Sequence, residues 1–98
     1  MYTFIREIGF RTMADGVKAV PIAASIAKYY KDNHDVSMRL MRPIGGAPGR
    51  LRFIFELASL DRFQAIQTKV ATDTNFHKLL GELAPLIDGS RTNDEIWA

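Results

Sequence analysis

Two hydrophobic periods alternate along this chain, and their order constrains the fold more than any other feature of the sequence. The clearest segment is 50–58, where apolar and polar residues alternate as in a strand with one buried face. Segments 2–11 and 36–44 repeat this two-residue period, and a weaker strand is expected over 90–98. The sequence therefore predicts four strands, the second and third of which are consecutive.

The segment between the first two strands follows the three-and-four spacing of a helix. Thr12 or Asp15 is expected to cap this helix, which extends to about Lys31 and contains Pro21. Proline removes one helical hydrogen bond and clashes with the preceding turn, so we expect a kink there or a regular helix that begins near Pro21. The predicted buried stripe comprises Val17, Val20, Ala24, Ala27 and Lys31, widened by Ile22, Ile26 and Tyr29 or Tyr30.

A second helical segment is expected after the third strand, in two parts. Ser59 is predicted to cap the first part, Thr72–Asn75 to form a corner with a fresh cap, and Gly89 to end the segment. The predicted buried stripe comprises Leu60, Phe63, Ile66, Gln67 and Val70 before the corner, and Phe76, Leu79, Leu80, Leu83 and Leu86 after it.

Three glycines and a proline within 45–49 predict a loop, so the second and third strands should form a hairpin. Aligning the apolar faces fixes only the parity of the register. The simplest choice pairs Leu40 with Phe55 and places Arg39 opposite Glu56, although a two-residue slip keeps the same parity.

Strand, helix, two strands, helix and strand is the split βαβ arrangement. It predicts a ferredoxin-like α+β sandwich, with helices on one face of a four-stranded antiparallel sheet. The chain has 98 residues, the size of one domain, so we expect a single domain over 1–98.

Both faces of the predicted sheet carry apolar side chains. One face holds Ile5, Met41 and Ile54, and the other holds Phe4, Leu40, Phe53 and Phe55. Monomers rarely leave a contiguous apolar patch of more than about a few hundred Å² exposed. We therefore expect a homodimer in which sheet faces pack against each other. The alternative is that Ile5, Met41 and Ile54 are apolar residues scattered singly on the surface.

Composition excludes several kinds of site. The absence of cysteine removes disulfides, cysteine nucleophiles and zinc–thiolate centres. The net charge of +2 is too small to indicate a nucleic-acid partner. No segment is long and apolar enough to span a bilayer, and residues 1–11 lack the apolar run of a secretory signal. We expect a cytoplasmic protein with no membrane partner.

Three features of the chain resemble a known superfamily. They are the β-α-β-β-α-β layout, the stretch from Thr72 to Leu80 followed by Pro85-Leu86-Ile87, and the terminal Glu95-Ile96-Trp97. In these features the chain resembles the dimeric α+β barrel proteins, in particular their NIPSNAP-like and antibiotic-biosynthesis-monooxygenase-like groups. The resemblance implies a homodimer with a pocket in each subunit between the sheet and the helices.

Some members of this superfamily are cofactor-free monooxygenases, and others degrade heme. Residues 78–81 contain no histidine where the heme-degrading relatives place their ligand. The first strand has Arg6 and Glu7, not the asparagine of those relatives. We therefore expect no cofactor.

Arg6, Arg39 and His77 are the candidate ligand-binding residues. Each arginine interrupts an otherwise apolar strand, and an arginine that pointed into the pocket would suit a carboxylate or enol ligand. A salt bridge between Arg39 and Glu56 is the alternative. A histidine side chain can ligate, donate to a ligand or act as a base near neutral pH, so His77 is a candidate, but it equally fits an exposed helix position.

Two further clusters have plainer interpretations. Asp32, His34 and Asp35 have no second cluster that would complete a metal site, so we predict a solvated turn and no metal. The arginines of the hairpin, Arg39, Arg42, Arg50 and Arg52, suggest an anion contact or an edge protected from aggregation.

Three functions are open on the sequence. The first is a homodimer that binds a small organic molecule between the sheet and the helices. The second is a cofactor-independent monooxygenase or isomerase acting on a bulky aromatic compound. The third is a structural or partner-binding dimer without catalysis.

Overall fold

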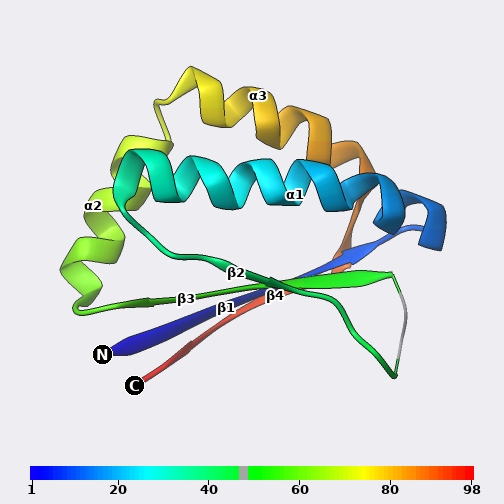
Figure 1. Ribbon diagram of the computed structural model, residues 1–98, viewed down its shortest axis with the longest axis horizontal. Coiled ribbons are helices and arrows are strands. Elements are labelled where there is room, and N and C mark those ends of the chain that lie inside the picture. Colours follow the sequence, from blue (N-terminus) through cyan, green and yellow to red (C-terminus); the bar gives the residue numbers. More distant parts are fainter. Residues whose placement is uncertain (47–48) are drawn as a thin grey trace.

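The computed structural model describes residues 1–46 and 49–98. Its elements are β1 (Tyr2–Phe10), α1 (Met13–His34), β2 (Arg39–Met41), β3 (Arg50–Leu57), α2 (Leu60–Val70), α3 (Thr74–Leu83), the 3₁₀ turn η1 (Ala84–Leu86) and β4 (Ile87–Trp97). The strands form one antiparallel sheet in the order β2-β3-β1-β4. All helices lie on one side of that sheet, and the two termini lie close together (Figure 1). The ferredoxin-like α+β fold is therefore confirmed.

Polar side chains fix where the three helices begin. The acceptors are Thr12 Oγ1, 3.0 Å from the amide of Asp15, Ser59 Oγ, 3.1 Å from the amide of Arg62, and Asp73 Oδ1, 2.9 Å from the amide of Asn75. Each cap satisfies a backbone donor that the first helical turn leaves unpaired. The predicted caps at Ser59 and at the corner near Asp73 are confirmed.

Helix α1 differs from the prediction in its end and in its buried face. It continues through Pro21 without a restart and ends at His34, about one turn beyond Lys31. Val17 is exposed, whereas the buried residues are Ala19, Ala23, Ile26, Tyr29 and Tyr30. The predicted stripe is wrong at Val17, Ala24 and Lys31, which are exposed, and correct at Ile26, Tyr29 and Tyr30. The buried face near the start of the helix is formed by Ala19 and Ala23, whose small side chains allow a close approach to the sheet.

The hairpin register also differs from the prediction. Leu40 lies opposite Phe53 and Arg39 lies opposite Ile54, so the predicted register is wrong by two residues. No Arg39–Glu56 pair forms across these strands, because Glu56 lies beyond the end of the three-residue β2. The parity is correct, since Leu40 and Phe53 share one face. Of the predicted loop over 45–49, residues 47 and 48 lie outside the described residues.

The last strand begins earlier than predicted. Helix α3 ends at Leu83, η1 contains Pro85, and β4 starts at Ile87. Gly89 therefore lies inside β4 and does not end a helix, which corrects the prediction. The proline explains the difference, because it lacks the backbone donor that a continuing helix needs.

A register shift divides β4 into two parts. Glu7 lies opposite Asn93, but Gly9 lies opposite Asp88. At this shift a Cβ on Gly9 would come within 2.4 Å of the Arg91 Cβ, so the position requires glycine.

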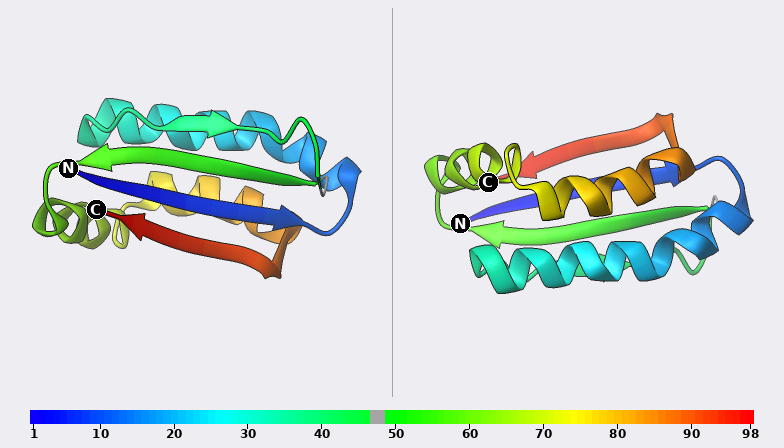
Figure 2. Two further views of the ribbon diagram at one scale, coloured as in Figure 1. Left: turned by 90° about the horizontal axis from the view of Figure 1, so that it is seen from below. Right: turned by 90° about the horizontal axis from the view of Figure 1, so that it is seen from above.

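The two faces of the sheet match the predicted assignment. The face under the helices holds most of the core, and its buried apolar strand residues are Phe4, Ile8, Phe10, Leu51, Phe53 and Leu57. Ile5 and Ile54 are opposite each other on the other face, which no helix covers (Figure 2). We call this second face the outer face. In the described ranges, no helix is both long and apolar enough to cross a membrane.

Candidate functional site

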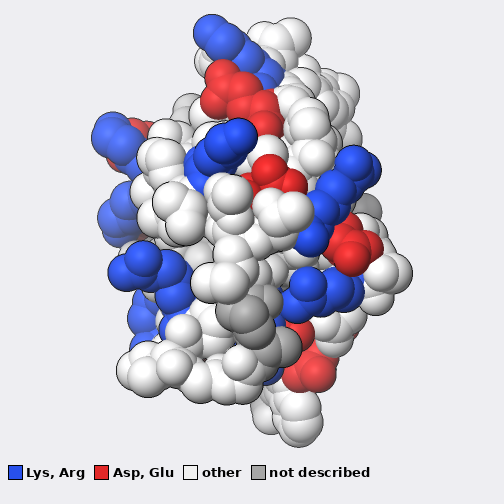
Figure 3. All heavy atoms as spheres, turned by 90° about the vertical axis from the view of Figure 1, so that its right-hand side faces the viewer, with Lys and Arg blue, Asp and Glu red and all other residues white. Residues whose placement is uncertain are grey.

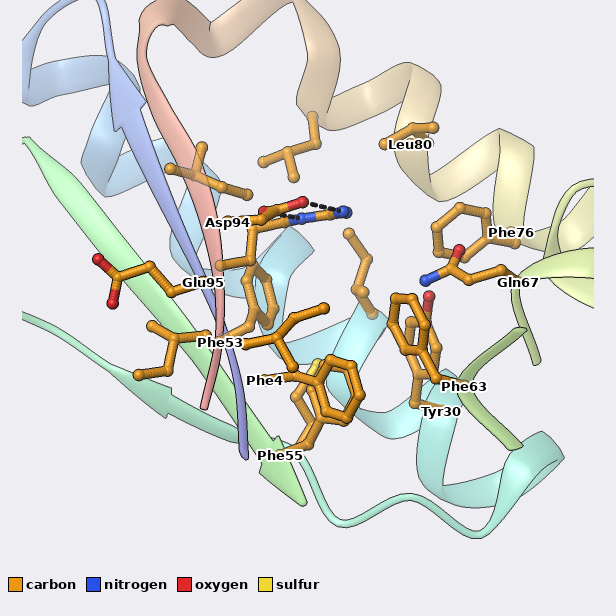
Figure 4. Close-up of a pocket in the computed structure, with 17 residues that line it drawn as sticks. Phe4, Tyr30, Phe53, Phe55, Phe63, Gln67, Phe76, Leu80, Asp94 and Glu95 are labelled. Atoms are coloured by element: carbon orange, nitrogen blue, oxygen red, sulfur yellow. Dashed lines mark hydrogen bonds and ion pairs between the residues drawn. The ribbon is translucent and has the colours of Figure 1, made fainter. Parts of the chain in front are cut away.

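A pocket of about 100 Å³ lies between the sheet and the helices (Figure 4). Strands β1, β3 and β4 and all three helices contribute to its walls. Most of the lining is apolar, and aromatic rings from five elements meet in it: Phe4, Tyr30, Phe53, Phe55, Phe63 and Phe76. Apolar concavities with a few polar groups are the usual form of a small-molecule site.

One wall of the pocket is a stack of parallel rings. The centroids of Phe4 and Phe63 are 4.4 Å apart with an interplanar angle of 14°. On the sheet, Phe4 also stacks on Phe55 at 5.1 Å and 6°. These contacts join β1, β3 and α2, so the wall is held by three separate elements.

Arg6 and Asp94 form the charged part of the pocket. Arg6 donates from Nε to Asp94 Oδ1 at 2.7 Å and from Nη2 to Asp94 Oδ2 at 2.8 Å. This is the parallel, two-bond geometry of a strong arginine–carboxylate pair. The hydrogen bonds that Arg6 donates to Asp94 raise the pKa of Arg6, so the guanidinium stays charged. The pair lies at the surface, since the two side chains are 50% and 55% exposed.

Tyr30 and Gln67 contribute the other polar atoms of the lining. Tyr30 is only 7% exposed, and its hydroxyl has no hydrogen-bond partner among residues 1–46 and 49–98. Burial raises the pKa of this hydroxyl, while the charge of Arg6 acts in the opposite direction. Gln67 comes from α2, on the side of the pocket that faces Asp94 across the cavity (Figure 4).

The pocket reaches the surface between α3 and β4. Leu80 on α3 and Ile96 on β4 line it and are both exposed. The half-exposed Arg6–Asp94 pair also belongs to this rim. A ligand entering here would pass the ion pair before it reached the aromatic wall.

The three candidate residues from the sequence do not come together. Arg6 lines the pocket, as expected for an arginine that interrupts an apolar strand. Arg39 lies on the outer face at the edge strand β2, opposite Ile54. His77 is exposed near the corner between α2 and α3, and its Nε2 is 2.6 Å from the Ala71 carbonyl oxygen. Neither Arg39 nor His77 lines the pocket.

The hairpin arginines surround an acid on the outer face. Glu7 Oε1 accepts a hydrogen bond from Arg50 Nη1 and another from Arg52 Nε, each at 2.9 Å. The hydrogen bond from Arg52 is the main cause that lowers the pKa of Glu7. At the end of the molecule that carries the hairpin, acidic side chains lie among the Lys and Arg (Figure 3). The predicted basic cluster is therefore partly neutralised.

A third polar group joins the end of α1 to the start of α3. The hydroxyl of Tyr29 donates to Asp73 Oδ2 and lies 3.3 Å from His34 Nε2. This hydrogen bond lowers the pKa of Asp73, which also caps α3. No three His, Cys, Asp or Glu side chains within the described part of the chain are grouped as a metal site requires.

Comparison with known proteins supports the fold. No protein-family model matches the chain, and no curated protein matches it either. Among solved structures, a NIPSNAP family protein from Agrobacterium tumefaciens is 19% identical, with a TM-score of 0.76 over 99% of this chain and 90% of its own. An uncharacterized NIPSNAP domain protein from Burkholderia xenovorans is 13% identical, with a TM-score of 0.74 over 100% and 93%.

A structure named as an antibiotic biosynthesis monooxygenase is also similar. It is 12% identical, with a TM-score of 0.75 over 100% of this chain and 97% of its own. The structural neighbours are thus the two groups that the sequence resembles. At these identities the similarity shows a shared fold, while residue roles have to come from this chain.

Sequence reasoning missed three polar residues of the pocket. Tyr30 was an option in the predicted stripe of the first helix, but no pattern separated it from Tyr29. Gln67 carried a usable signal, since it is a polar residue inside an otherwise apolar stripe. Asp94 lies in the segment Asn93-Asp94-Glu95, which has poor strand propensity. Its place depends on the register shift in β4, which the sequence pattern does not encode.

Proposed function

We propose that this chain forms a cytoplasmic homodimer that binds a small organic molecule in the pocket between its sheet and helices. The observation that carries the proposal is the unpartnered hydroxyl of Tyr30 in an aromatic pocket that also holds a charged arginine. Among the described residues no buried side-chain N or O atom lacks a partner, so the free hydroxyl of Tyr30 is open to the pocket. A ligand in the pocket can therefore hydrogen-bond to it.

The dimer is proposed on the outer face. Ile5 and Ile54 form a cross-strand apolar pair at the centre of that face. Met41 and Trp97 are large, exposed and placed toward its two edges. A second copy of the chain offers the same apolar surface and would cover this one by two-fold symmetry.

Ligand binding is tested with benzyl alcohol, a neutral single-ring probe, followed by NMR of the ¹⁵N-labelled protein. We expect benzyl alcohol to change the amide chemical shifts of residues that line the pocket. Leu80→Trp fills the pocket mouth and should make these changes smaller. Leu60→Trp is the matched control, because Leu60 is an exposed helix leucine that does not line the pocket. Shifts that are absent, or that persist unchanged in Leu80→Trp, contradict the proposal.

The dimer is tested by size-exclusion chromatography with light scattering. The wild type should elute at twice the 11.0 kDa of one chain. Ile54→Asp should elute as a folded monomer, because it places a charge at the centre of the outer face. If the wild type has the molar mass of one chain at micromolar concentration, the proposed dimer is wrong.

A cofactor-independent monooxygenase acting on a bulky aromatic compound is the second candidate. It is favoured by the similarity to a structure named as an antibiotic biosynthesis monooxygenase and by the aromatic lining. The measurement is oxygen consumption with aromatic quinol substrates. Consumption above the uncatalysed rate that falls in Leu80→Trp supports this candidate, and a rate equal to the blank removes it.

A further inference from the structure

We propose that the pocket selects ligands in which a single aromatic ring carries a carboxylate, with the carboxylate bound by the free edge of Arg6 and the hydroxyl of Tyr30. This inference rests on the proposed function and names the chemical class of its ligand. Three features of the pocket carry it: the geometry of Arg6, the hydroxyl of Tyr30 and the donors that remain free. Charge and space then narrow the class of ligand.

The first feature is the geometry of Arg6. A guanidinium has five N–H donors and two edges that can each bind a carboxylate through two parallel bonds. Asp94 occupies the edge formed by Nε and Nη2. The described residues leave the edge formed by Nη1 and the second Nη2 hydrogen without a partner. Arg6 lines the pocket, so this second edge is available to a ligand there.

The second feature is the hydroxyl of Tyr30. Tyr29 and Tyr30 are adjacent and each is 7% exposed. Among the described residues the Tyr29 hydroxyl has partners in Asp73 and His34, whereas the Tyr30 hydroxyl has none. Tyr30 lines the pocket on the side of α1, and it interacts electrostatically with Arg6. A ligand oxygen between Arg6 and Tyr30 would satisfy both groups.

The third feature is the set of donors that the pocket still offers to a ligand. Both oxygens of Asp94 already accept a bond from Arg6. The side chain of Glu95 points away from the other labelled residues, in keeping with its pairing opposite Ile5 on the outer face (Figure 4). The remaining groups are the free edge of Arg6, the Tyr30 hydroxyl and the Gln67 amide, which has no partner within the described ranges. A ligand that presents acceptor oxygens fits this set.

Charge favours a carboxylate over a neutral acceptor. Hydrogen bonds between ionised partners are roughly twice as strong as those between neutral groups. Arg6 is permanently charged, and Asp94 neutralises it from one edge only. The rim position keeps the pair half exposed, so solvent moderates the repulsion between Asp94 and a second carboxylate.

Space and shape favour one ring. The cavity volume is about 100 Å³, and its far wall is the parallel stack of Phe63, Phe4 and Phe55. Aromatic ligands pack on such walls in offset or edge-on arrangements. A second fused ring would have to extend through the mouth between Leu80 and Ile96.

The test compares benzoate with benzyl alcohol as probes, using NMR titration of the wild type, Tyr30→Phe and Tyr29→Phe. We expect the wild type to bind benzoate at least about tenfold more tightly than benzyl alcohol, and Tyr30→Phe to lose about tenfold in benzoate affinity. Tyr29→Phe is the matched control, since it deletes a hydroxyl that already has a partner outside the pocket. Its benzoate affinity should stay within about twofold of the wild type.

Arg6→Lys provides a second line of evidence. It keeps the positive charge but removes the planar fork, so benzoate affinity should fall while binding of benzyl alcohol is retained. Equal affinity of the wild type for both probes, or an unchanged benzoate affinity in Tyr30→Phe, would overturn the carboxylate class and leave the proposed function standing. Failure of both probes to bind would overturn the proposed function as well.

Discussion

Arg6 and Glu7 are neighbours on β1 that point to opposite faces of the sheet, and both form ion pairs with other strands. Glu7 is 22% exposed and accepts hydrogen bonds from two arginines of β3 through one oxygen. Arg6 is half exposed and gives only one of its two edges to Asp94 of β4. The outer cluster, Glu7 with Arg50 and Arg52, only joins two strands. The inner pair, Arg6 with Asp94, joins two strands and still offers hydrogen-bond donors to the pocket. The same chemistry is thus structural on one face and suited to binding on the other.

The largest effect should come from deleting a ring of the inner face. Phe4→Ala removes a buried side chain that stacks on two others, so we expect a loss of about 4 kcal/mol in the free energy of unfolding. Ile5 follows Phe4 on β1 and points to the outer face. Ile5→Ala should lower the free energy of unfolding by about 1 kcal/mol when the protein is dilute enough to be monomeric. Urea denaturation at several protein concentrations measures both. A cost of Ile5→Ala that grows with concentration sharpens the comparison, because it shows that a second copy covers the outer face.

The next largest effect concerns Gly9, on the same strand β1 as Arg6 and Glu7. Gly9→Ala places a Cβ within 2.4 Å of the Arg91 Cβ and 2.9 Å of the Arg91 carbonyl oxygen, so β4 must move. We expect a loss of about 2–3 kcal/mol in the free energy of unfolding. Gly89→Ala in the same strand is the control, since its Cβ would meet nothing within 4 Å. Similar stabilities for the two variants would show that the shift in β4 tolerates a side chain.

A smaller effect is expected from the outer cluster. Glu7→Gln removes the charge between Arg50 and Arg52 and should cost about 1 kcal/mol at neutral pH. The pKa of Glu7 is lower in the folded state than its ordinary value of 4.5. Its contribution is therefore present above that value and is lost as the pH falls through the folded-state pKa. The difference in stability between wild type and Glu7→Gln should shrink between pH 6 and pH 3, and a constant difference would argue against the ion pair as its source.

The smallest effect on stability should come from the inner pair. Asp94→Asn breaks a salt bridge whose partners are both half exposed, so we expect a change of under about 1 kcal/mol. The variant also frees the edge of Arg6 that Asp94 occupies and leaves the second edge available, so it should preserve or strengthen benzoate binding. A large loss of stability would place Asp94 with the structural ions of the outer face and remove the contrast between the two faces.

The sequence specified the inner face of the sheet well, and the reason is physical. Alternation over Leu51, Phe53 and Leu57 has only one solution once a single face is buried, and these residues are indeed core. Arg6 was identified for the same reason, since a charge in an apolar alternation stands out. The hairpin register was not determined, because alternation repeats every two residues and is blind to a slip of that length.

The remaining pocket residues depend on contacts between distant segments. Tyr30 and Tyr29 are identical in chemistry and adjacent in sequence, and only the position of Asp73 on another helix decides which hydroxyl has a partner. His77 stood out because it is a histidine, yet its ring bonds to the Ala71 carbonyl and does not line the pocket. Local sequence patterns carry no information on either contact.

The shift at Gly9 has a consequence for the electrostatics of the pocket. Between the pairs Glu7–Asn93 and Gly9–Asp88, β4 advances by more residues than β1, and the parity of its faces is reversed. If the pairing at Gly9 continued unchanged along β1, the residue opposite Arg6 would be Arg91 and not Asp94. Two like charges would then meet at the mouth of the pocket. A residue without a side chain therefore determines, at a distance along the strand, whether the pocket arginine faces an acid or a second cation.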